Sequence, residues 1–88
     1  MKTLKFVGMS RDDLRAFSVE AKYAVGMELR QVQNGSMPTD WKPMPGIGAG
    51  VYELRVHEAE EWRVIYVAKL SDAVYVLHAF QKKGRKTR

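Results

Sequence analysis

The sequence predicts a small α+β domain, in which two N-terminal helices pack on one face of an antiparallel sheet in the order β-α-α-β-β-β. Two observations carry this prediction. Apolar residues recur at helical spacing in the N-terminal part of the chain, and they alternate with period two over the C-terminal part. Proline and glycine are concentrated between the two parts. With 88 residues, positions 1–88 are expected to form a single domain.

The N-terminal part predicts a short strand and two helices. Residues 3–7 (TLKFV) suit a strand. The first helix is expected over 10–16 with Ser10 as its N-cap, and the second over 19–33 after a new start at Ser18. The helices are expected to form an antiparallel or bent pair. One apolar stripe should face the core, and it consists of Phe17, Ala21, Val25, Leu29 and Val32.

Residues 35–50 have a different composition, because they hold all three prolines and four of the seven glycines. Gly35, which follows Asn34, is a plausible stop for the second helix. The segment is not expected to form a regular element. Trp41 and two methionines indicate that it is an ordered loop packed against the body of the protein.

Three strands are predicted after the loop, over 51–57, 61–67 and 73–80. The connections EAE (58–60) and KLSD (69–72) are short, so the strands should form an antiparallel meander. If residues 58–60 form the first turn, and Ser71 with Asp72 forms the second turn, the register of the three strands is fixed. The expected pairs are His57 with Glu61, Arg55 with Arg63, Glu53 with Ile65, Arg63 with Phe80, and Ile65 with His78.

This register divides the side chains between two faces of the sheet. The apolar face, which the helices should cover, carries Tyr52, Leu54, Val56, Trp62, Val64, Tyr66, Leu77 and Ala79. The opposite face, called here the cationic face, carries Glu53, Arg55, His57, Arg63, His78 and Phe80, with Ile65, Val67 and Val76 between them.

Arg55 and Arg63 come out as direct cross-strand neighbours, and like charges so placed cost about 0.2–1 kcal/mol. An anion held between two guanidinium groups would offset that cost, and a phosphate fits their geometry. Glu53 and Glu61 are the alternative, since either carboxylate would neutralise the pair. A two-residue first turn would instead place the arginines on opposite faces. His78 is expected to be a satisfied, partly buried histidine.

The net charge of +5 lies entirely in residues 82–88, because the remaining ten Lys and Arg match ten Asp and Glu. This basic tail predicts a phosphate site, a solubilising end, or a chain that stops before its last element. No cysteine is present, and the two histidines show no metal-ligand spacing, so neither a metal nor a cofactor is expected. An apolar run that would suit a signal peptide or a membrane span is lacking, and a cytoplasmic protein is expected.

The stretches PTDWKPMPGIGAGVYELRV, EWRVIYVA and VYVLHAFQKK, taken in order, resemble the phage-derived Gp49-like and HigB-like proteins of the RelE toxin superfamily. The resemblance implies a metal-independent endoribonuclease that cuts messenger RNA, usually on the ribosome. The implied reaction is attack by the RNA 2′-OH on the adjacent phosphorus. The implied partner is an antitoxin, often a helix-turn-helix protein, so that any contact with DNA would be indirect.

The resemblance also implies which residues act. Arg55 and Arg63 would stabilise charge on the phosphate, and His57 would transfer protons. Lys83, the fourth catalytic candidate, or Lys82 would guide the RNA backbone, or assist the reaction if it gave up its proton more readily than an ordinary lysine. Further substrate-binding candidates are Glu53, which is also a weaker base candidate, Lys42 and Arg85. Relatives commonly continue into a C-terminal helix where this sequence has GRKTR. The alternatives are a non-enzymatic relative that binds an antitoxin or RNA, and a phage protein that inhibits a host factor.

Overall fold

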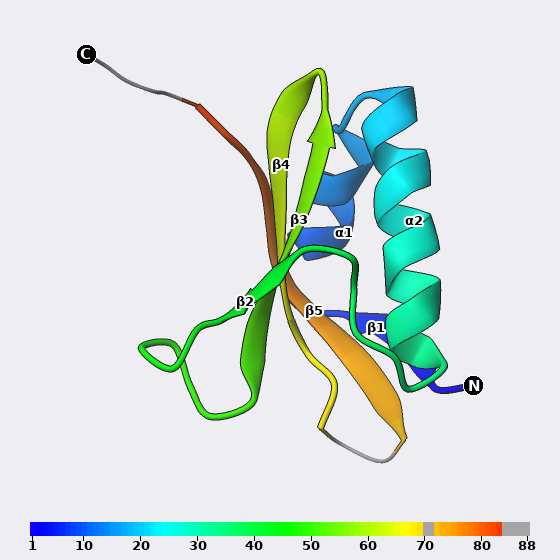
Figure 1. Cartoon of the computed structure of the whole chain (residues 1–88), viewed down its shortest axis with the longest axis vertical. Coiled ribbons are helices and arrows are strands. Elements are labelled where there is room, and N and C mark those ends of the chain that lie inside the picture. Colours follow the sequence, from blue (N-terminus) through cyan, green and yellow to red (C-terminus); the bar gives the residue numbers. More distant parts are fainter. Residues whose placement is uncertain (70–71, 84–88) are drawn as a thin grey trace.

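The fold is described from a computed structural model, which defines residues 1–69 and 72–83. The elements are β1 (Thr3–Phe6), α1 (Ser10–Arg15), α2 (Val19–Gln33), β2 (Trp41–Pro43), β3 (Val51–Glu58), β4 (Glu60–Val67) and β5 (Ala73–Lys82) (Figure 1). Within the described residues, five strands form one sheet in the order β1-β5-β4-β3-β2. The α+β class is therefore confirmed, with both helices ahead of the meander.

Two features of the sheet differ from the prediction. The sheet is mixed rather than antiparallel, because β1 pairs in parallel with β5, starting at Thr3 opposite Ala73. In addition, the segment 35–50 is not wholly irregular, since Trp41–Pro43 forms a short edge strand against β3. Proline is tolerated in β2 because an edge strand leaves one row of backbone groups unpaired.

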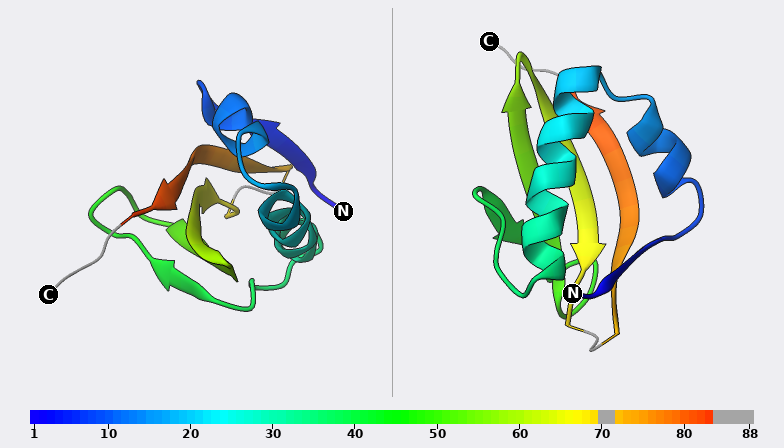
Figure 2. Two further views of the ribbon diagram at one scale, coloured as in Figure 1. Left: turned by 90° about the horizontal axis from the view of Figure 1, so that it is seen from above. Right: turned by 90° about the vertical axis from the view of Figure 1, so that its right-hand side faces the viewer.

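The two helices contact different parts of the sheet. Figure 2 shows α2 along one face and α1 beside β5. The predicted start of α2 is confirmed, since the Ser18 hydroxyl accepts a hydrogen bond from the Ala21 amide at 3.1 Å. The prediction that Ser10 is the N-cap of α1 is wrong, because Met9 holds that position and Ser10 is the first residue of the helix. Its buried hydroxyl instead donates to the Val76 carbonyl at 2.9 Å, which ties α1 to β5.

The apolar stripe of α2 packs on the sheet as predicted. Phe17 contacts Trp62, with ring centroids 4.7 Å apart.

The prediction of which β5 side chains face the core is partly wrong, because a β-bulge interrupts the pairing of β5 with β4 between Ile65 and Tyr66. The bulge adds one residue to β5, so the side chains that precede it lie on the face opposite to the predicted one. Val76 consequently lies in the core, and Leu77 is only partly buried.

The β3–β4 hairpin has the predicted register, with Arg55 opposite Arg63 and His57 opposite Glu61. Ala59 is the connecting residue, and its φ of 65° lies in the left-handed region that non-glycine residues seldom adopt. This tight connection determines which side chains of β3 and β4 share a face.

Candidate functional site

The cationic face of the sheet lies opposite α2, and β2 and the C-terminal half of β5 flank it (Figure 2). Cross-strand pairing arranges its side chains in three rows. The rows are Lys42, Glu53, Ile65 and His78; Arg55, Arg63 and Phe80; and His57, Glu61 and Lys82. Six predicted site residues, including Lys82, therefore share one surface formed by four strands.

A carboxylate joins the two arginines at the centre of this face. Arg55 Nε donates a hydrogen bond to Glu53 Oε1 at 3.0 Å, and Arg63 Nε lies 3.7 Å from the same oxygen. The Glu53 side chain is only 10% exposed, so its charge acts in a weakly screened setting. The interpretation in which carboxylates neutralise the arginine pair thus describes the structure.

Arg63 is the more enclosed of the two arginines. Its side chain is 7% exposed, against 29% for Arg55. Arg63 Nη1 donates to Glu61 Oε1 at 3.1 Å and to the Trp62 carbonyl at 3.2 Å. These contacts fix its guanidinium plane. Arg55 is therefore the arginine that is better placed to meet a ligand from solvent.

His57 is held between two carboxylates. Its Nδ1 lies 2.7 Å from Glu61 Oε1, and its Nε2 lies 2.6 Å from Asp40 Oδ2. Both nitrogens donate only when the ring is protonated. The hydrogen bonds to Glu61 and then to Asp40 raise the pKa of His57 above its ordinary value of 6.5. His57, followed by Arg63, lowers the pKa of Glu61 below 4.5.

Asp40 is a member of the site that the sequence patterns did not single out. Its carbonyl accepts from the Arg55 amide at 3.0 Å, which extends the β2–β3 pairing by one residue. The neighbouring Thr39 is anchored on α2, where its amide and hydroxyl donate to the Glu28 carboxylate at 2.8 and 2.9 Å. The available signal for Asp40 was its position directly before Trp41. The pairing of this segment with β3 was missed, because residues 35–50 were expected to form a loop.

The lysines of the predicted site lie at its margins. Lys42 is the cross-strand neighbour of Glu53, and Lys82 that of Glu61. Both lysines are exposed, as is Lys83, which follows the last residue of β5. Alternation along β5 places Lys82 on the side of Phe80. The candidate Arg85 lies outside the described residues.

His78 is not partly buried as predicted. Its side chain is 58% exposed and its ring stacks on Phe80, with centroids 5.2 Å apart and planes 24° from parallel. Its Nδ1 lies 3.7 Å from a carboxylate oxygen of Asp13 in α1. The first row thus ends in His78 and the second in Phe80, and the two rings stack on each other.

Neither a metal centre nor a membrane span is apparent in the part of the chain that the structure describes. Over residues 1–69 and 72–83, no group of three or more His, Asp or Glu side chains is placed to hold a metal ion. The helices in those residues are too short or too polar to cross a bilayer.

Comparison with protein families gives a match. The sequence model of the family described as phage derived protein Gp49-like (DUF891) matches residues 12–88, which is most of the chain. No curated protein matches the sequence significantly. The match includes all of β2 to β5, and therefore every strand that contributes to the cationic face.

Proposed function

Because the chain belongs to the phage-derived Gp49-like family, a family of RelE- and HigB-like toxins, we propose that it is the toxin of a type II toxin-antitoxin system. Its proposed activity is that of an endoribonuclease that cleaves messenger RNA without a metal ion, on the ribosome. The proposed silencing partner is a helix-turn-helix antitoxin. The observation that carries the activity is the row of Arg55 and Arg63 next to a histidine whose pKa is raised.

The proposed reaction is an internal phosphoryl transfer. The RNA 2′-oxygen attacks the adjacent phosphorus as its proton leaves, and the bond from phosphorus to the 5′-oxygen breaks. The products are a 2′,3′-cyclic phosphate and a 5′-hydroxyl. Catalysis must stabilise the charge of the phosphorane, accept one proton and donate another.

Arg55 is the proposed phosphate ligand. Its Nε is engaged by Glu53, and within the described residues its side chain makes no other hydrogen bond, so the remaining N–H groups can meet two phosphate oxygens. Arg63 holds Glu53 and Glu61 through ion pairs. The guanidinium groups remain charged throughout the reaction, which suits them to a phosphorane.

His57 is the proposed general acid. A protonated imidazole can donate to the leaving 5′-oxygen, and the two flanking carboxylates stabilise that protonated form near neutral pH. One of its two hydrogen bonds must open during donation, and the bond to Asp40 is the better candidate, because Glu61 is also held by Arg63. Glu53 remains the weaker candidate for the base that receives the 2′-OH proton, and exposed Lys82 or Lys83 would guide the RNA backbone.

Induced expression in a bacterium tests this function. Arg55→Ala is the informative variant, because Arg63→Ala would leave Glu53 and Glu61 without a buried partner and would also lower stability. Arg11→Ala is the matched control, since Arg11 is an exposed arginine on α1. We expect growth arrest and new transcript 5′ ends within translated regions for the wild type and Arg11→Ala, and neither for Arg55→Ala. New ends in untranslated RNA would contradict the ribosome requirement.

A non-enzymatic binding protein is the second candidate function. The observation that favours it is the neutralisation of the arginines by Glu53 and Glu61, since ion-paired guanidinium groups interact less strongly with a substrate phosphate. Such a protein would bind an antitoxin, RNA or a host factor without cleavage. Intact transcripts in cells that contain the folded wild-type protein would favour this candidate.

A further inference from the structure

An aromatic pair lies on β5 at the edge of the cationic face, where Phe80 ends the arginine row and His78 ends the row beside it. The His78 and Phe80 rings are stacked within 24° of parallel, with centroids 5.2 Å apart. His78 is 58% exposed and Phe80 is partly buried, so the pair is accessible from solvent. The pair thus brings an ordered aromatic surface to the edge of the cationic face.

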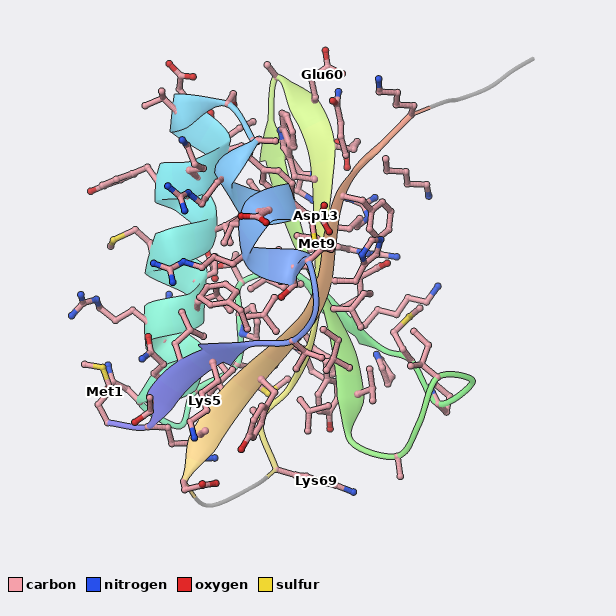
Figure 3. The ribbon with its side chains drawn as sticks, turned by 180° about the vertical axis from the view of Figure 1, so that it is seen from behind. Met1, Lys5, Met9, Asp13, Glu60 and Lys69 are labelled. Atoms are coloured by element: carbon pink, nitrogen blue, oxygen red, sulfur yellow. The ribbon has the colours of Figure 1, made fainter. Side chains whose placement is uncertain are left out.

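Asp13 supports the orientation of this pair. A carboxylate oxygen of Asp13 lies 3.7 Å from His78 Nδ1, and Figure 3 shows Asp13 on α1 beside β5. Within the described residues, His78 makes no polar contact through Nε2. The ring is thus held from one edge, and its other edge is available to a ligand.

The pair has a defined position relative to the arginines. Phe80 is the cross-strand neighbour of Arg63, and Arg63 is that of Arg55. Neighbouring strands are about 5 Å apart, which puts the Phe80 backbone about 10 Å from that of Arg55. One nucleotide unit, with its phosphate at Arg55 and its base at Phe80, spans such a separation.

We propose that His78 and Phe80 form a stacking subsite for a nucleobase of single-stranded RNA, beside the phosphate held by Arg55. This proposal rests on the proposed function and adds the part of the substrate that the arginines do not recognise. Bases of single-stranded RNA are free to stack on aromatic side chains, which tolerate any base because every base has a π face. His78 Nε2 would add a hydrogen bond to one base edge. The subsite would position the nucleotide and take no part in proton transfer.

Binding of uncleavable oligonucleotides tests the subsite. Two fluorescent probes of equal length are needed, a single-stranded DNA without 2′-OH groups and an abasic oligomer with the same backbone charge. Fluorescence polarisation at low salt would compare wild type, Phe80→Leu, His78→Ala and Arg55→Ala. Tyr23→Leu is the matched control, because Tyr23 is an aromatic residue on α2 that is 72% exposed. Thermal unfolding of each variant verifies that it is folded.

We expect Phe80→Leu to weaken binding of the base-containing probe roughly fivefold or more, and to leave binding of the abasic probe unchanged. Arg55→Ala should weaken binding of both probes, and Tyr23→Leu neither. Equal binding of the base-containing probe by wild type and Phe80→Leu, with Arg55→Ala still impaired, would overturn the stacking subsite and leave the RNA function intact. If wild type bound neither probe, the RNA function would fail and the subsite with it.

Discussion

Arg55 and Arg63 are direct cross-strand neighbours, and a single carboxylate oxygen of Glu53 lies 3.0 Å from the Nε of one and 3.7 Å from the Nε of the other. The protein therefore holds its own anion at the place where the arginine pair suggested an external one. This carboxylate offsets the repulsion of the pair in the free protein, and it would have to share or yield its contacts when a phosphate arrives.

Glu53→Gln is expected to destabilise the protein by about 1–3 kcal/mol, because the enclosed Arg63 loses a charged partner. Chemical denaturation measures the loss. Inorganic phosphate should restore part of the stability of the variant by taking the place of the carboxylate, and it should stabilise wild type less.

Glu58→Gln is the control for that experiment, since Glu58 is an exposed carboxylate at the end of the same strand. It should change the free energy of unfolding by less than about 0.5 kcal/mol. A Glu53→Gln variant as stable as this control, or indifferent to phosphate, would contradict the bridging role of Glu53.

The pH dependence of stability follows from His57 and Glu61. The folded-state pKa of His57 is raised above 6.5, so its contribution is complete below pH 6.5 and is lost as pH rises through the folded-state pKa. The pKa of Glu61 is lowered below 4.5, so its contribution is present above pH 4.5 and is lost as pH falls through the folded-state pKa. His57 and Glu61 together should therefore stabilise the folded protein most between pH 4.5 and pH 6.5.

Asp40→Asn should lower the pKa of His57, because it removes one of the two carboxylates that stabilise the imidazolium. Imidazole resonances in an NMR titration report this pKa directly. Glu28→Ala should act in the same direction but more weakly, by releasing Thr39 from α2. A wild-type His57 that titrated at or below 6.5 would show that the carboxylates do not hold it in solution.

Ala59→Gly should stabilise the β3–β4 hairpin by up to about 1 kcal/mol, because glycine adopts the observed φ of 65° without a Cβ penalty. Ala24→Gly, in the middle of α2, is the opposite case and should cost about 1 kcal/mol. The comparison is made by thermal unfolding. Destabilisation by Ala59→Gly would mean that the connection differs from the one that sets the arginine register.

RNA affinity should fall steeply as salt is raised, because phosphate contacts release counterions from the RNA. Lys82→Ala should reduce the slope of log affinity against log salt by about 1, if Lys82 contacts one phosphate. Replacement of Lys5, which lies near the Tyr75 ring, should leave the slope unchanged. An identical slope for wild type and Lys82→Ala would remove Lys82 from the interface.

Local patterns were sufficient to predict the central hairpin. The connection 58–60 is too short for more than one register that keeps the apolar residues on one side, so the pairing of Arg55 with Arg63 followed from it. The helix boundary at Ser18 and the buried stripe of α2 were predictable for the same reason, because capping and helical periodicity depend only on neighbouring residues.

Features that depend on distant pairing were not predictable in this way. The parallel pairing of β1 with β5 joins the first residues to the last strand, and the bulge opposite Ile65 and Tyr66 has no signature in β5 itself. The strand character of β2 was concealed by its proline. Asp40 therefore joined the site only when these long-range pairings were known, whereas His78 was predicted on the right face but with the wrong burial.

The most direct test of the central claim is to map and chemically characterise the RNA ends made by purified protein on ribosome-bound messenger RNA. Wild type and Arg11→Ala should both produce 2′,3′-cyclic phosphate and 5′-hydroxyl ends at the same positions with added EDTA, whereas a folded Arg55→Ala protein should produce none. Unchanged cleavage by Arg55→Ala, or 5′-phosphate ends that disappear with EDTA, would contradict a metal-independent ribonuclease site on the cationic face.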